Sequence, residues 1–216
     1  MKKINFLGDS ITAGSGVDNP QDMYTRLVSK YFNAEECNFG LGGTRIARQL
    51  YPSDHPEYNE NFMQRAVKMP KDADFTFCFG GTNDYGHGDA PLGKLEDSGD
   101  DTFYGATARL FKYLADTYGK KNVCIILPLP RYNQSNPYGE GNKKAAGAIL
   151  TDYIGAEKEV AELLDMEYLD FSEHFPEPKS NLGDELTVDG LHPNKKGHKL
   201  LADLLIKYLE SKGFTK

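Results

Sequence analysis

The feature that most constrains the fold of this chain is a regular alternation of two hydrophobic patterns. Short runs that are almost wholly apolar recur along the sequence, and stretches with helical spacing of apolar residues separate them. An apolar run without polar alternation is typical of a strand buried on both faces of a parallel sheet. The predicted strands are Ile4–Leu7, Cys37–Phe39, Phe75–Phe79, Val123–Leu127 and Tyr168–Phe171. The predicted helices are Tyr24–Phe32, Tyr58–Val67, Phe103–Tyr118, Ile149–Leu163 and Pro193–Lys212.

This alternation predicts a three-layer α/β fold. Parallel strands that are joined by helices require right-handed crossovers, which place helices on both faces of the sheet. The chain has 216 residues and contains no repeat, low-complexity tract or linker, so we expect a single domain over residues 1–216. Ligands of such folds bind beyond the carboxyl ends of the strands. The loops that follow the predicted strands are therefore the expected position of a functional site.

Composition excludes several classes of partner. The formal net charge is -7 and no cluster of Lys and Arg forms a stripe, which argues against nucleic acid or an anionic membrane. Gly8 and Asp9 end the first apolar run too early for a signal peptide, and no run is long enough to span a bilayer. We therefore expect a cytoplasmic protein. Three cysteines, an odd number without a C-x-x-C pair, are expected to be buried core residues.

Four loops of the predicted rim carry small and polar residues of the kinds that acyl transfer uses. They are Gly8-Asp9-Ser10, Asn38 to Thr44, Gly80-Gly81-Thr82-Asn83-Asp84 and Asp189-Gly190-Leu191-His192.

A serine nucleophile would need three kinds of help, and these loops offer each. A neutral imidazole such as His192 takes the proton of the Ser10 hydroxyl. Asp189 lies three residues before His192, so in a helical turn the two side chains share one side, and its carboxylate fixes the tautomer of the ring. The N–H groups of Ser10 and Gly43 and the amide of Asn83 are candidate donors for an oxyanion hole.

Each of these residues also has a simpler explanation. Ser10 is of the type that caps a following helix, and Gly43 suits an ordinary turn. Asn83 is able to satisfy the backbone of its own loop, and His192 suits an exposed position before a helix that begins with proline. The convergence of all four segments on one rim favours the catalytic interpretation.

In order and spacing, the four segments resemble the sequence blocks of the SGNH (GDSL-like) hydrolase superfamily. The resemblance implies that Ser10 is the nucleophile, that Asp189 and His192 complete a triad, and that Ser10, Gly43 and Asn83 form the oxyanion hole. It also implies a flavodoxin-like sheet of strand order 2-1-3-4-5 and hydrolysis of esters or thioesters through an acyl-enzyme, without metal or cofactor. Asp9 is implied to brace the loop that holds Ser10.

Three other classes of protein share parts of this pattern. An α/β-hydrolase would need a G-x-S-x-G motif, which is absent. A metallophosphoesterase would need ligand spacing among the remaining histidines, which they lack, and His198 is expected to be solvated on the polar side of the last helix. The non-enzymatic rival is a flavodoxin-like protein that binds FMN or another phosphate at Ser10–Gly14, where a helix begins.

The rim loops indicate a polar, hydroxyl-rich substrate. Polar and aromatic residues fill 51–55, 85–89 and 131–134, and no long apolar loop suggests a channel for a fatty chain. We therefore expect a small-molecule ester with a short acyl group, acetyl in first place, for which an acetylated carbohydrate is a candidate. The alternative is a lysophospholipase or acyl-thioesterase of the same superfamily. The sequence leaves open the oligomeric state and the role of an acidic insertion that contains Glu96, Asp97, Asp100 and Asp101.

Overall fold

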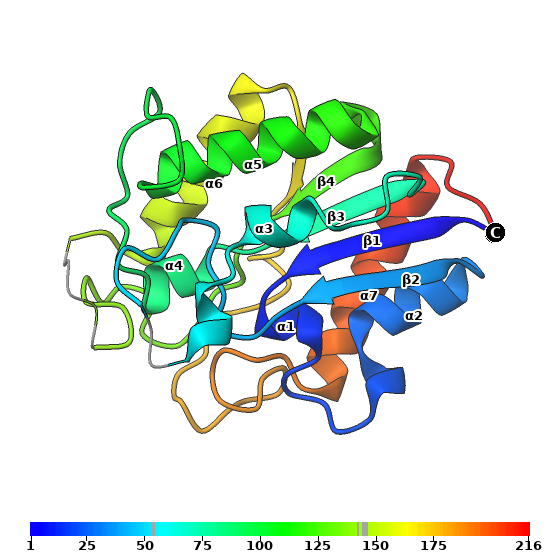
Figure 1. Ribbon diagram of the computed structural model, residues 1–216. Coiled ribbons are helices and arrows are strands. Elements are labelled where there is room, and N and C mark those ends of the chain that lie inside the picture. Colours follow the sequence, from blue (N-terminus) through cyan, green and yellow to red (C-terminus); the bar gives the residue numbers. More distant parts are fainter. Residues whose placement is uncertain (53–54, 142, 144–146) are drawn as a thin grey trace.

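The predicted three-layer α/β architecture is confirmed. A computed structural model describes residues 1–52, 55–141, 143 and 147–216. Its five strands form one parallel sheet in the order β2-β1-β3-β4-β5, and helices cover both faces (Figure 1). This is the order 2-1-3-4-5 that the resemblance implied.

The elements follow the predicted alternation. The strands are β1 (Lys3–Gly8), β2 (Glu35–Gly40), β3 (Phe75–Phe79), β4 (Val123–Ile126) and β5 (Glu167–Leu169). The α-helices are α1 (Ser10–Ala13), α2 (Tyr24–Tyr31), α3 (Phe62–Ala66), α4 (Thr82–Gly86), α5 (Phe103–Tyr118), α6 (Leu150–Leu163) and α7 (Lys195–Ser211). Single 3-10 turns are η1 (Pro20–Asp22), η2 (Pro56–Asn59) and η3 (Lys120–Asn122).

Both faces of the sheet are buried along β1, β3 and β4, as the wholly apolar runs predicted, while the edge strands β2 and β5 are partly exposed. Ile4 and Phe6 of β1 pack in a cluster with α2 and α7, while Leu7 packs in a second cluster with α3, α5 and α6. Successive side chains of a strand point to opposite faces, so one run supplies both clusters. All three cysteines are free and buried.

Two helices begin later than the periodicity predicted, because capping side chains set their starts. The predicted helix over 58–67 is broken at Asn61, which forms a reciprocal capping box with Gln64 and starts α3. The last helix begins at Lys195 because the Asn194 side chain accepts hydrogen bonds from the N–H groups of residues 196 and 197.

The expectation for His198 was wrong. Its side chain is completely buried, its Nδ1 accepts the Tyr24 N–H at 3.2 Å, and its Nε2 donates to the Ser15 carbonyl oxygen at 3.2 Å. Burial lowers the pKa of this ring, which stays neutral. His198 therefore links α7 to the loop after α1 and to the start of α2.

Part of the acidic insertion forms ion pairs with arginine side chains. Asp101 pairs with Arg48, and Asp100 lies between Arg48 and Arg109. These ion pairs are exposed, so solvent screens them and each contributes little to stability. Within the described residues, no helix combines the length and apolar character needed to cross a membrane.

The sheet brings three of the four sequence segments together. Gly8 at the end of β1 is in register with Gly40 at the end of β2 and with Phe79 at the end of β3. The loops that begin at these three residues consequently leave the sheet at one edge, with α1 and α4 beside it (Figure 1).

Candidate active site

Ser10 stands at the start of α1, immediately after the first strand. The side chain that caps this helix belongs to Asp9, whose Oδ1 accepts the Ile11 N–H at 3.0 Å. Asp9 is buried, and burial raises the pKa of its carboxyl to about 6. The simpler explanation of Ser10 as the cap therefore fails, because the cap precedes it and the Ser10 hydroxyl is bonded elsewhere.

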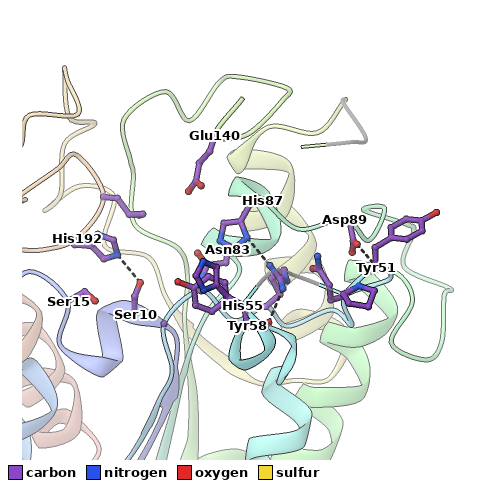
Figure 2. Close-up of a pocket in the computed structure, with 16 residues that line it drawn as sticks. Ser10, Ser15, Tyr51, His55, Tyr58, Asn83, His87, Asp89, Glu140 and His192 are labelled. Atoms are coloured by element: carbon purple, nitrogen blue, oxygen red, sulfur yellow. Dashed lines mark hydrogen bonds between the residues drawn. The ribbon is translucent and has the colours of Figure 1, made fainter. Parts of the chain in front are cut away.

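The Ser10 hydroxyl is bonded to His192, which in turn is bonded to Asp189. Ser10 Oγ lies 2.9 Å from His192 Nε2 (Figure 2). His192 Nδ1 lies 2.7 Å from Asp189 Oδ2. An ionised carboxylate only accepts, so Nδ1 carries the proton and Nε2 is left to accept from the serine. The structure thus joins the three residues that the sequence singled out for acid–base and nucleophilic work.

Asp189 and His192 share one side without a helical turn. The predicted turn is replaced by an Asx turn, in which Asp189 Oδ1 accepts the N–H groups of Leu191 and His192 at 3.0 and 2.8 Å. Burial alone raises the pKa of Asp189, but the hydrogen bonds from His192 and from these N–H groups outweigh it, so the pKa lies below its ordinary value. The carboxylate is therefore held ionised and oriented toward the ring.

The three predicted oxyanion donors line the same cavity as the Ser10 hydroxyl. Among the described residues, the N–H groups of Ser10 and Gly43 donate to no protein acceptor. Asn83 is anchored by one Nδ2–H, which donates to the Thr44 carbonyl oxygen at 2.9 Å, and its amide has a second N–H. Gly43 has φ +72°, and a Cβ there would lie 2.7 Å from the Tyr58 ring, so a larger residue does not fit.

One buried arginine connects the loops that carry these donors. Arg65 of α3 donates to the carbonyl oxygens of Gly8 and Phe39, which end β1 and β2, and to the Thr44 hydroxyl. Burial lowers the pKa of this guanidinium to about 10, so it keeps its charge at neutral pH. The sequence does not point to Arg65, because the helix that contains it carries no motif of the site.

Asp84 fixes the same region from the other side. Its two carboxylate oxygens accept the N–H groups of Ile46 and Ala47, each at 2.9 Å. Burial raises the pKa of Asp84 to about 6 despite these hydrogen bonds. The loop after β2 and the helix that carries Asn83 are thus held against each other.

Glu157 of α6 lies behind the same loop with no hydrogen-bond partner. It is completely buried, and neither carboxylate oxygen is bonded to any described residue. A Cβ added to Gly81 would lie 2.2 Å from Glu157 Oε1, which shows how closely the carboxyl backs the Asn83 segment. Burial raises the pKa of Glu157 well above its ordinary value, so the folded protein holds it protonated.

We expect Glu157→Gln to gain stability over the parent protein as pH rises. The unfolded chain releases this proton near pH 4.5, whereas the folded chain keeps it to higher pH, so the parent loses stability above that value. Within that window the loss approaches about 1.4 kcal/mol per pH unit, and glutamine does not share it. Urea unfolding at pH 5 and pH 8 measures the difference. Glu159→Gln, on the exposed face of the same helix, is the control; an equal effect of Glu157→Gln at both pH values would contradict the expectation.

The candidate site opens into one large cavity. The cavity has a volume of about 820 Å³, with Ser10 and His192 at one end and Tyr51 and Asp89 at the other (Figure 2). Its remaining lining residues are Ser15, Gly42, Gly43, Arg45, Gln49, Pro52, His55, Tyr58, Asn83, His87, Glu140 and Leu191. This wall is polar and aromatic, as expected from residues 51–55 and 85–89.

Some cavity residues were not singled out by sequence reasoning. Arg45 directly follows the segment Asn38 to Thr44, whereas Glu140 lies outside every segment that the sequence singled out. Only the contacts of these two residues in the fold place them at the cavity. The described residues contain no group of three or more His, Cys, Asp or Glu side chains that would hold a metal ion.

The chain is similar to a known family and to solved structures. The model of the GDSL-like Lipase/Acylhydrolase family matches residues 6–200. A search of curated proteins found no match. Among solved structures, a Lactobacillus plantarum protein is 27% identical, with a TM-score of 0.77 and 97% of each chain covered.

Two further solved structures share the fold at lower identity. The aryl esterase of M. smegmatis is 17% identical with a TM-score of 0.67, and the alignment covers 98% of this chain and 99% of that one. A carbohydrate acetylesterase of Sinorhizobium meliloti is 15% identical with a TM-score of 0.63 and the same coverage.

Proposed function

Since the chain belongs to the GDSL-like lipase/acylhydrolase family and is therefore an ester-bond hydrolase, we propose that it is a serine esterase for short-chain acyl esters, acetyl esters in first place. The observation that carries the proposal is the chain of contacts from Ser10 Oγ through His192 to Asp189, at 2.9 and 2.7 Å, at one end of the cavity.

The mechanism follows from these contacts. Ser10 Oγ attacks the ester carbonyl carbon while His192 Nε2 takes its proton. The carbonyl oxygen becomes an oxyanion, for which the N–H groups of Ser10 and Gly43 and the Asn83 amide are the donors. The imidazolium then gives its proton to the leaving alcohol, and an acyl group remains on Ser10. Water, deprotonated by His192, hydrolyses this acyl-enzyme and restores the serine.

The substrate is inferred from the cavity wall. A long acyl chain gains affinity from apolar walls, whereas Arg45, His87, Asp89 and Glu140 give this cavity a polar lining. An acetyl group fills only a small part of about 820 Å³, so the alcohol occupies most of the space. A carbohydrate is an alcohol of suitable size and polarity, and the S. meliloti relative is described as a carbohydrate acetylesterase.

We expect acetyl esters to be the preferred substrates. Along p-nitrophenyl acetate, butyrate and octanoate, kcat/KM should fall by at least about 10-fold, because each added methylene meets a polar wall. Steady-state kinetics with the three esters measures the trend. A rise with chain length would favour the lysophospholipase or acyl-thioesterase alternative instead.

The flavin-binding alternative receives no support from the site. Its phosphate cradle would be the N-terminus of α1, which has only four residues. The Ser10 hydroxyl that would bind a phosphate is bonded to His192.

A further inference from the structure

His87 is a titratable side chain of the cavity that the proposed mechanism does not use. It follows α4, and its backbone N–H donates to the Asn83 carbonyl oxygen at 3.0 Å, so its position is tied to that of a proposed oxyanion donor. Its ring lines the cavity beside Asn83 (Figure 2).

Arg45 fixes the tautomer of the His87 ring. Arg45 Nη1 lies 2.8 Å from His87 Nδ1, and a guanidinium has only donors, so Nδ1 accepts. Burial and the nearby Arg45 charge lower the pKa of His87, and they outweigh Glu140, which raises it. The His87 ring is therefore neutral. The single ring proton therefore sits on Nε2, which is bonded to no described residue.

Arg45 itself is immobilised. It is 3% exposed, and its Nη2 donates to the Tyr58 carbonyl oxygen at 2.8 Å. With both terminal nitrogens engaged, Arg45 orients His87 and is a poor receptor for an anionic group of a ligand.

Glu140 supplies an acceptor in the same cavity. Its Oε1 is held by Arg131 Nη2 at 2.7 Å, and Arg131 is buried against Thr82. The Glu140 N–H donates to the Gly86 carbonyl oxygen at 2.8 Å, which fixes the residue next to His87. Its second oxygen, Oε2, is bonded to no described residue.

We propose that His87 Nε2–H and Glu140 Oε2 form a subsite for a hydroxyl group of the substrate's alcohol, which makes that alcohol a neutral polyol such as a sugar. The inference rests on the proposed esterase function for the position of the ester. A hydroxyl accepts from one partner and donates to the other, which matches this pair. A hydrocarbon at the same place would cover a half-buried donor and a partly exposed carboxylate without bonding to either. A carboxylate or phosphate on the ligand would be repelled by Glu140.

The test compares two acetyl esters of similar shape, one on a sugar ring with hydroxyl groups and one on a hydrocarbon ring. Methyl 6-O-acetyl-glucopyranoside and cyclohexylmethyl acetate both carry the ester on a methylene attached to a six-membered ring. We expect kcat/KM for the sugar ester to exceed that for the hydrocarbon ester by at least about 10-fold. His87→Phe and Glu140→Gln should each lower this ratio by about 5- to 10-fold. Glu140→Gln keeps an oxygen for Arg131, so it reports on the subsite even where His87→Phe fails to fold.

Matched surface changes serve as controls. His174→Phe and Glu173→Gln replace the same residue types at exposed positions outside the cavity, and the ratio should stay unchanged. A ratio near or below one in the parent, or an unchanged ratio in both folded subsite variants, would overturn the subsite while leaving the esterase function intact.

A binding measurement separates the two proposals. Titration of the protein with methyl glucopyranoside, followed by NMR, reports on the subsite without any hydrolysis. We expect binding that weakens about 5-fold or more in Glu140→Gln. Absence of hydrolysis for every ester would refute the proposed function, whereas absence of sugar binding would refute the subsite.

Discussion

Replacing Ser10 with alanine is expected to lower kcat for p-nitrophenyl acetate by at least about 10⁴-fold, because the attacking oxygen is lost while the rest of the site stays in place. The fold should be unaffected. Asp9 supplies the helix cap, and the Ser10 hydroxyl bonds only His192 among the described residues. Initial rates with the purified variant, together with its melting temperature, measure both expectations.

A matched serine separates this effect from the loss of any hydroxyl. Ser29 of α2 is also buried, and its hydroxyl has no partner among the described residues. Ser29→Ala should keep both the activity and the melting temperature of the parent. If Ser10→Ala retained more than about one hundredth of the parental kcat, another group would have to be the nucleophile.

Replacing Asp189 with asparagine is expected to lower kcat by about 10⁴-fold with little change in KM. The remaining oxygen still accepts the N–H groups of Leu191 and His192, so the turn survives. The new amide N–H₂ faces His192 Nδ1, which then has to accept and leaves the ring proton on Nε2. That tautomer is unable to take the proton of Ser10. Steady-state kinetics on p-nitrophenyl acetate measures the loss.

The same loop contains a control aspartate. Asp184 Oδ1 accepts the N–H groups of Leu186 and Thr187 in a similar turn, away from the imidazole. Asp184→Asn should therefore change kcat by less than about 3-fold. Comparable losses in the two variants would mean that the loop needs a negative charge for its conformation, and that Asp189 has no particular effect on His192.

Strong hydrophobic patterns made much of the fold predictable from the sequence. The bounds predicted for β3 and α5 match the structure, because Phe75–Phe79 is apolar throughout and the α5 stripe ends at a glycine. The predicted helix over 58–67 was wrong in its first half, because the Asn61–Gln64 capping box acts through side-chain hydrogen bonds that apolar periodicity does not register.

The predictability of the site divides in the same way. The residues proposed for the chemistry, among them Ser10 and His192, stand in short motifs that point to their chemistry. The contact between Arg45 and His87 joins positions 42 residues apart and depends on how two loops pack. The prediction for His198 was wrong because the polar side of a helix is normally exposed. In this protein the His198 ring stacks on the Tyr24 ring, with the two ring centroids 5.9 Å apart.

The place of His198 has a consequence for how this protein loses activity. Ser10 directly follows β1 of the sheet, while His192 precedes α7. The two hydrogen bonds of the His198 ring are among the contacts that hold α7 to the segment after Ser10. The separation of the proposed nucleophile and the proposed base therefore depends on the docking of α7. We expect partial release of α7 to separate the two side chains while all five strands remain paired, so that inactivation precedes global unfolding. The rate of ester hydrolysis should then fall when α7 is released, before any spectroscopic signal of the sheet changes.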